Sequence, residues 1–413
     1  MKHTSLTLKT SLALIAAAGL TSQITAAPLV SLGSNFDIFA LGSLKGQYNS
    51  NVLSNPGGPG KTEDYILTMS PGVELDYGRD SDTQANLNFH EDMLRYDKNP
   101  SLDANLANVA ITASHDQGPL KVSANFSYIQ AYTNNSPGIV GTVPLTTIIR
   151  SDVINTGAKA TYDFTEKVFG DGAFNYSQTE YLGSSANGFQ NYESYNLPFD
   201  LFYSYSAKVD VGVSYAFTQQ TPQNTFGAPA TQPNVGRSRY TNYGGVTVKL
   251  HEWEKLDGSA SIGATTNHLD AAPGPLPGFQ SVDTVNLGYN VNLAYSYTDK
   301  LNFSLQGSHS FNPGAQGQNI ESYSANLGAH WDYSPTIYFE STIIGFTYSD
   351  YIQNQPVRHD DTYTTGVSAF WVPTKYLTLS AGYSYFMNSS YTPSPSTPTY
   401  NINVVTISAS IRY

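Results

Sequence analysis

The sequence predicts an all-β chain, folded as a transmembrane antiparallel β-barrel of about 18 strands. Three observations predict it. Apolar and polar residues alternate with a period of two, the alternating segments are commonly 11 to 15 residues long, and the connections between them alternate between short and long. A tilted strand needs about 9–11 residues to cross a bilayer, whereas strands in globular proteins usually have roughly five or six.

The period of two is clearest in residues 285–297, where every odd position is apolar or aromatic and every even position is small or polar. Residues 120–128, 209–217 and 301–311 repeat the pattern. Successive side chains of a strand point to opposite faces, so each of these segments has one apolar and one wet face. No helical period competes over a comparable length.

The connections set the number of strands. Short turns are expected near 79–82, 116–118, 165–167, 206–207, 254–257, 298–299, 334–335 and 373–374. Longer loops, rich in Pro, Gly, Asn and Ser, are expected near 49–62, 98–103, 133–149, 182–191, 221–237, 269–280, 312–319, 350–360 and 389–398. Eight turns and nine loops join 18 strands and leave both termini on the short-turn side. Bacterial outer-membrane barrels have this arrangement, with short periplasmic turns and longer extracellular loops.

Aromatic residues mark both ends of the predicted strands. All three tryptophans, Trp253, Trp331 and Trp371, stand shortly before a short turn. The long-loop ends also carry aromatic residues: Tyr48, Tyr96, Tyr132, Tyr181, Phe311 and Tyr348. Amphipathic rings prefer the interface between hydrocarbon and water, so the pattern predicts two aromatic girdles.

Composition excludes several classes of protein. The chain has 413 residues, a formal charge of −12 and no cysteine, which excludes disulfide scaffolds, thiol nucleophiles and cysteine-bound metals. An acidic chain with few lysines is a poor binder of nucleic acid, and we expect no nucleic-acid partner. No run of 18 apolar residues follows the N-terminal segment, so helical membrane spans are not expected.

The N-terminus reads as a secretory signal peptide. Lys2 and Lys9 are basic, an apolar stretch follows over 12–20, and small residues stand at 25–27. We expect residues 1–26 to be removed and 27–413 to form the barrel, with a charge of −14. A core helix is the alternative for this segment.

The chain ends within its last predicted strand. Val405, Ile407, Ala409, Ile411 and Tyr413 share one face of it. This resembles the C-terminal signal that outer-membrane proteins present to the barrel assembly machinery, although phenylalanine is the commoner last residue. The apolar face of the barrel would contact outer-membrane lipid.

The polar face is expected to line an aqueous lumen, because 18 strands enclose more space than their side chains fill. Alternation assigns these pore-lining residues to it: Asp92, Lys121, Asp200, Asp210, Lys249, Asn286, Asn290, Asn292 and Asp332. Uncharged hydrogen-bonding groups with a modest excess of acids favour neutral polar solutes and weakly favour cations. The alternative is that these groups hydrate the lumen without selecting. Inward folding of 133–149 or 221–237 would narrow the pore.

Clusters that suggest chemistry are few, and the sequence predicts no enzyme, cofactor or metal site. The densest are His90-Glu91-Asp92 and, in an expected loop, His359-Asp360-Asp361. Neighbouring strand residues point to opposite faces and cannot converge on one atom. Asp76, Asp80 and Asp82 could bind calcium at a turn, but exposed turn acids explain them as well. No Gly-x-Ser-x-Gly motif is present.

The opening strands resemble a known family. Residues 47–52, Gln-Tyr-Asn-Ser-Asn-Val, are followed by an extended segment over 65–77 that contains Ser70-Pro71-Gly72. This pattern is similar to that of the β-barrel porins associated with exopolysaccharide and exosortase gene clusters. The motifs that carry the resemblance lie only in the first two strands. The resemblance implies an outer-membrane barrel and carries over no catalytic residue.

These observations predict a porin-like outer-membrane channel for small polar solutes or saccharides. One alternative is a barrel that supports exopolysaccharide secretion without conducting. An outer-membrane hydrolase is another. A soluble β-propeller would have blades of about 40–45 residues, close to the hairpin spacing here, but its strands are short and no blade motif recurs.

Overall fold

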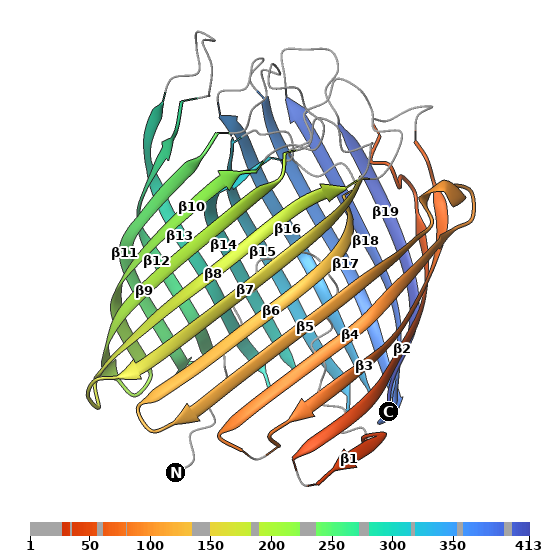
Figure 1. Cartoon of the computed structure of the whole chain (residues 1–413), viewed down its shortest axis with the longest axis horizontal. Coiled ribbons are helices and arrows are strands. Elements are labelled where there is room, and N and C mark those ends of the chain that lie inside the picture. Colours follow the sequence, from red (N-terminus) through yellow and green to blue (C-terminus); the bar gives the residue numbers. More distant parts are fainter. Residues whose placement is uncertain are drawn as a thin grey trace.

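The computed structural model describes residues 27–33, 35–55, 61–79, 81–133, 149–182, 190–223, 237–271, 281–314, 319–352, 358–391 and 399–413. Within these ranges, long antiparallel strands wrap into one tilted cylinder (Figure 1). No helix in the described ranges is long and apolar enough to cross a membrane. Residues 1–26, the predicted signal peptide, lie outside the described part of the chain, and so do most of 133–149 and 221–237.

The strands follow the sequence in order. Their bounds are β1 Val30–Leu32, β2 Phe36–Asn49, β3 Asp64–Tyr77, β4 Thr83–Tyr96, β5 Ala104–Gln117, β6 Leu120–Thr133, β7 Ile149–Asp163, β8 Val168–Leu182, β9 Tyr192–Ser206, β10 Val209–Pro222, β11 Arg239–Trp253, β12 Leu256–Leu269, β13 Val282–Thr298, β14 Leu301–Pro313, β15 Asn319–Ser334, β16 Ile337–Ile352, β17 Arg358–Thr374, β18 Leu377–Tyr391 and β19 Tyr400–Arg412. A single 3-10 turn, Pro100–Leu102, stands between β4 and β5.

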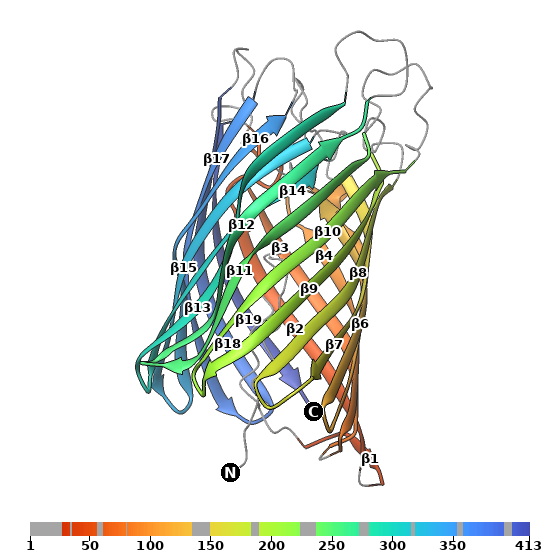
Figure 2. The ribbon, with the colours of Figure 1, turned by 90° about the vertical axis from the view of Figure 1, so that its left-hand side faces the viewer.

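Each strand from β2 to β19 pairs antiparallel with its neighbours in the chain, and β19 pairs with β2 to close the sheet. The closing seam runs from Val404 opposite Asn49 to Arg412 opposite Leu41. At its end, the backbone of Tyr413 exchanges two hydrogen bonds with Ala40. The predicted barrel of 18 strands is therefore confirmed. The short β1 pairs with the start of β2 outside this count, and it lies at the same end as the C-terminus (Figures 1 and 2).

One face of the wall is apolar and accessible. Large side chains are about half exposed there on strand after strand, among them Val213, Val246, Ile262, Leu287 and Ile407. Apolar side chains exposed all round a closed sheet fit hydrocarbon, which cannot hydrogen-bond a backbone and so tolerates a sheet only when its edges are closed. The chain is an outer-membrane barrel.

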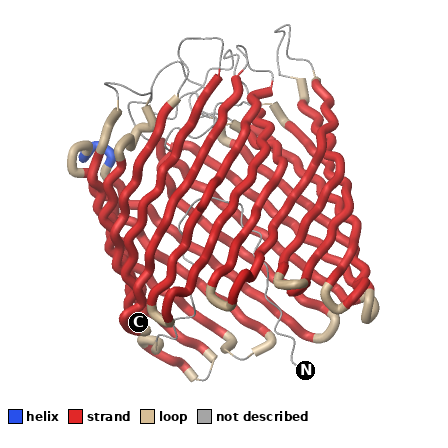
Figure 3. The backbone as a smooth tube through the Cα atoms, turned by 180° about the vertical axis from the view of Figure 1, so that it is seen from behind, coloured by secondary structure: helices blue, strands red, loops and turns tan. Residues whose placement is uncertain are grey.

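The turn-side aromatic belt is as predicted. Trp253, Trp331 and Trp371 are 43%, 44% and 50% exposed, which puts them at the outer surface near the short turns. Figure 3 shows tight turns at the end of the barrel that carries the C-terminus.

The loop-side girdle was predicted wrongly for three of its six members. Tyr96, Tyr181 and Phe311 are only 8%, 7% and 8% exposed. Tyr96 packs in an apolar cluster with Val52, Ile66 and Leu102, where Val52 belongs to the chain that leaves β2. These three rings are therefore packed against protein at the extracellular end and do not face lipid.

Irregular positions affect the ladder locally. The Ile343-Ile344 pair breaks the alternation, and the register shifts there on both sides of β16, which marks a bulge. Pro71 and Pro198 interrupt the ladder on one side without shifting its register, because proline has no N–H to donate.

Candidate functional site

The nine residues predicted to line the pore share one face of the sheet. Residues directly opposite each other on adjacent strands point to the same face of the sheet. Asp210 is opposite Lys249, Lys249 is opposite Ser259, and Ser259 is opposite Asn292. The same procedure connects Asp92, Lys121, Asp200, Asn286, Asn290 and Asp332 to that face. It is the face opposite to the exposed apolar side chains.

Side-chain contacts identify this face as the concave one. The Lys249 ammonium on β11 lies 2.8 Å from Asp171 on β8, three strands away along the wall. Three strand spacings amount to roughly 14 Å between backbones, and only side chains that converge toward the barrel axis can close that distance. Lys159 also contacts Asp171, at 3.4 Å.

An aromatic surface supports this charged cluster. Phe169 and Phe202 stack with ring centroids 5.0 Å apart, and the Lys249 ammonium lies 3.7 Å from the centroid of the Phe202 ring. The Phe202 ring lies over Gly212, where a Cβ would come within 2.5 Å of the ring. The cation–π contact and the ion pair together fix the lysine against the wall.

Asp210 completes the group by accepting a hydrogen bond from His251 at 2.7 Å. The alternation of the sequence identifies Lys249 and Asp210. It missed Asp171, because no local pattern shows that β8 and β11 approach each other on the inside. It also missed His251, although this residue stands two positions from Lys249 on β11 and shares its parity.

A second charged cluster sits at the closing seam. The Arg412 guanidinium donates to Glu74 at 3.0 and 3.1 Å and to Asp76 at 3.0 Å, and it lies 3.5 Å from the centroid of the Phe39 ring. Asp76 also accepts from Asn86 at 2.5 Å. This network ties the last strand to the second barrel strand from the start, across the joint that closes the barrel.

Between the charged clusters the concave face carries small hydroxyls and amides. Ser308 and Ser324 lie 2.9 Å apart, and Ser380 and Ser408 lie 2.7 Å apart. Asn290 is exposed in mid-strand. Such groups can hydrogen-bond a polar solute or water without a charge requirement.

The two clusters considered for catalysis do not converge. Residues 359–361 were expected in a loop, but β17 begins at Arg358, so that expectation was wrong. Asp360 is fully buried and accepts hydrogen bonds from Arg358, Tyr351 and Ser390. His359 is on the opposite face, 3.2 Å from Asp350. The carboxyl of Asp360 is thus engaged in holding strands together.

At the other cluster, His90 and Asp92 share a face and are 3.9 Å apart, while Glu91 points away. Asp92 accepts from Ser70 at 2.6 Å and from Asn108 at 3.2 Å. Among the described residues, no group of three or more His, Asp and Glu could hold a metal ion. Asp80, part of the calcium hypothesis, lies outside them.

An ion pair links the long-loop ends of the first hairpins. The Lys98 ammonium donates to Glu63 at 2.5 Å, and Tyr48 donates to the same carboxylate at 2.9 Å. These two hydrogen bonds, with that from Lys98 the larger effect, hold the pKa of Glu63 below its usual value. Both Glu63 and Lys98 lie outside the strands.

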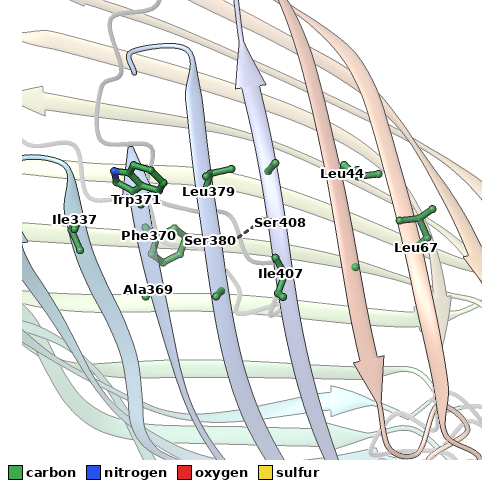
Figure 4. Close-up of a pocket in the computed structure, with 13 residues that line it drawn as sticks. Leu44, Leu67, Ile337, Ala369, Phe370, Trp371, Leu379, Ser380, Ile407 and Ser408 are labelled. Atoms are coloured by element: carbon green, nitrogen blue, oxygen red, sulfur yellow. Dashed lines mark hydrogen bonds between the residues drawn. The ribbon is translucent and has the colours of Figure 1, made fainter. Parts of the chain in front are cut away.

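The outer surface is hollowed across the seam, in a depression of about 650 Å³. Leu44, Leu67, Leu379, Ile407 and Trp371 line it from neighbouring strands (Figure 4). Its side chains are almost entirely apolar, so it suits hydrocarbon and offers no chemistry.

Comparisons with known proteins give only distant structural similarities. No family model and no curated protein matches the chain. The FrpB iron transporter from Neisseria meningitidis is similar at 11% identity and a TM-score of 0.48, covering 89% of this chain, and the chain spans only 63% of that transporter's length. OpdK from Pseudomonas aeruginosa, solved with vanillate, gives 7% identity and a TM-score of 0.45, with 91% and 99% of the two chains covered. The resemblance to exopolysaccharide-associated porins stays a prediction.

Proposed function

We propose that the protein is an outer-membrane channel that passes small polar solutes or saccharides. The observation that carries the proposal is the contrast between the two faces of one closed wall: apolar and exposed outside, polar and largely uncharged inside. An 18-strand barrel is wide enough for a water-filled bore. Its inner hydroxyls and amides would replace part of a solute's hydration shell.

We propose that the pore is lined by Asp92, Lys121, Asp200, Asp210, Lys249, Asn286, Asn290, Asn292 and Asp332. Asp171 and His251 join this set because they contact Lys249 and Asp210 directly. Carboxylates modestly outnumber ammonium groups among them, so we expect a weak preference for cations.

The deciding experiment is single-channel recording of the folded, detergent-extracted protein in planar bilayers. We expect stepwise currents, with a reversal potential in a salt gradient that indicates mild cation preference. Heat-denatured protein from the same preparation is the control. Folded protein that gives no steps would exclude a channel.

A barrel that supports exopolysaccharide secretion without conducting is the second candidate, and it rests only on the family resemblance. The same recording separates the two. We further propose that residues 1–26 are cleaved on export, which N-terminal sequencing of the membrane form would show as a start at Ala27. The strand ending at Tyr413 is our proposed signal to the barrel assembly machinery.

A further inference from the structure

The wall of the barrel is split near its extracellular end, between β13 and β14. Their ladder runs from Thr298 opposite Leu301 up to Asn290 opposite Ser308 and stops there. Both strands continue: β13 keeps its pairing with β12 up to Val282, and β14 keeps its pairing with β15 up to Pro313. The tip of the β14–β15 hairpin, here residues 309–314 and 319–323, has therefore separated from β13, while its β15 side stays paired with β16 up to Asn319 opposite Ile352.

A side-chain contact shows to which side the tip has moved. Extending the ladder would put Phe311 and Glu321 in line with Leu287, which is 59% exposed on the lipid face. Glu321 instead accepts a hydrogen bond from Asn286, whose side chain points to the opposite, inner face of β13. Phe311 and Glu321 are 8% and 9% exposed. The tip lies inside the barrel, behind β13.

Contacts farther along the wall agree. The Gln220 amide on β10 lies 3.5 Å from the Phe311 carbonyl, and Arg239 on β11 lies 3.4 Å from the Asn312 carbonyl. In a continuous wall β10 and β14 are four strands apart, about 19 Å, far beyond the reach of a glutamine. The tip must cross the inner faces of β13, β12 and β11 to meet these residues.

Arg239 is the centre of this contact. It is 2% exposed, donates to Gln220 as well as to the hairpin, and its guanidinium lies 5.8 Å from the centroid of the Phe311 ring. On the hairpin itself, His309 stacks on Tyr323 and lies 2.9 Å from Glu321.

We propose that this inward-packed tip of the β14–β15 hairpin is the constriction that sets the size limit of the channel, and that Arg239 holds it in place. The size limit of transport rests on the proposed channel function, whereas the inward position of the tip does not. The tip takes up part of the bore on the inner face of β11–β13, and weakening its attachment enlarges the cross-section open to solute.

The first test is geometric and needs no transport. Because the chain has no cysteine, cysteine pairs can be introduced without background. We expect Asn286→Cys with Glu321→Cys to cross-link in the folded, membrane-inserted protein through a short bifunctional maleimide. The matched control is Leu287→Cys with Glu321→Cys, which a continuous wall would bring to the same face. Cross-linking of the control pair and not of the first pair would overturn the inference.

The second test is conductance. Arg239→Ala should raise the unitary conductance severalfold and admit larger neutral sugars, and cross-linking 286 to 321 in that background should reverse both effects. Arg95→Ala is the control, since Arg95 is an exposed arginine at the same end whose bonds stay on its own strand and the next. Should Arg239→Ala fail to fold, Gln220→Ala removes a contact to the tip with less disturbance.

The outcomes separate the two proposals. If the wild-type protein conducts and neither Arg239→Ala nor Gln220→Ala changes the size limit, the constriction is refuted and the proposed channel function still stands. Folded protein that conducts in no variant, yet cross-links between 286 and 321, refutes the channel and retains the inward position of the tip.

Discussion

The assignment of inside and outside predicts how one arginine should act on either face of the same part of the wall. Ile262 and Asn290 stand near the middle of adjacent strands, one residue apart in register, since Ser261 is opposite Asn290. Ile262 is 54% exposed on the apolar face, and Asn290 is exposed on the polar one. Ile262→Arg should therefore place a cation in hydrocarbon, whereas Asn290→Arg should place it in water.

The expected cost follows from the depth of the site. Arginine on the lipid face of a barrel costs about 2–4 kcal/mol at the midplane, which lowers the folding equilibrium roughly 30- to 700-fold. The inner substitution should cost less than about 1 kcal/mol, a value typical of a solvated surface change.

The assay is equilibrium folding into phospholipid vesicles against guanidinium, followed by the fluorescence of the three tryptophans. Ile262→Ala is the control for loss of the side chain without a charge. If Asn290→Arg destabilised the barrel as much as Ile262→Arg, the assignment of the two faces would be refuted.

Three further changes probe charged groups. Arg412→Ala should lower the unfolding free energy by about 1–3 kcal/mol, because it leaves two carboxylates at the seam without their shared cation. The control is Arg79→Ala, at an arginine that is 57% exposed, which should cost under about 1 kcal/mol. The two variants are compared by their midpoints of unfolding in guanidinium. Lys249→Met should leave the inner wall more negative and move the reversal potential toward stronger cation selectivity, and no movement would argue against its place in the pore. The bond from Lys98 lowers the pKa of Glu63 from 4.5, so its stabilisation is fully present above about pH 4.5 and lost as pH falls through the lowered value. Glu63→Gln should accordingly lower the unfolding midpoint at neutral pH and not in strong acid.

The barrel could be predicted from the sequence because its signals are local. Each strand shows its two faces in its own alternation, and each turn shows its length, so strand number and orientation need no knowledge of distant contacts. The break in alternation at Ile343-Ile344 is local in the same way, since two adjacent apolar residues stand at the bulge. The turn-side tryptophans followed from their distance to the nearest turn.

The loop-side girdle could have been tested by the same alternation. Tyr96 shares the parity of Asp92, and that places its ring on the inner face, where a membrane belt cannot form. Tyr181 shares the parity of Asp171 in the same way. The signal was present, but proximity to a loop was given more weight than the face of the strand.

Phe311 is a different case, because its parity is that of the lipid face and its side chain is nevertheless buried. Alternation gives the side of the sheet on which a residue stands, but not where the sheet itself goes. Only the contacts from Gln220 and Arg239, on strands remote in the sequence, show that the hairpin has turned inward. The same limit hid the approach of Lys249 to Asp171.

The two ends of the barrel therefore use their aromatic residues for different tasks. At the turn end the tryptophans are exposed and anchor the wall at the interface with lipid. At the loop end, Val52 and Tyr96 pack inside one part of the mouth, and Phe311 packs inside another. Apolar side chains that pack inside the mouth reduce the cross-section of the pore that is open to solute. The middle of the wall instead carries exposed amides such as that of Asn290. The size of solute that can pass should accordingly be limited at the extracellular mouth, and this size limit should respond to changes there before it responds to changes in mid-wall.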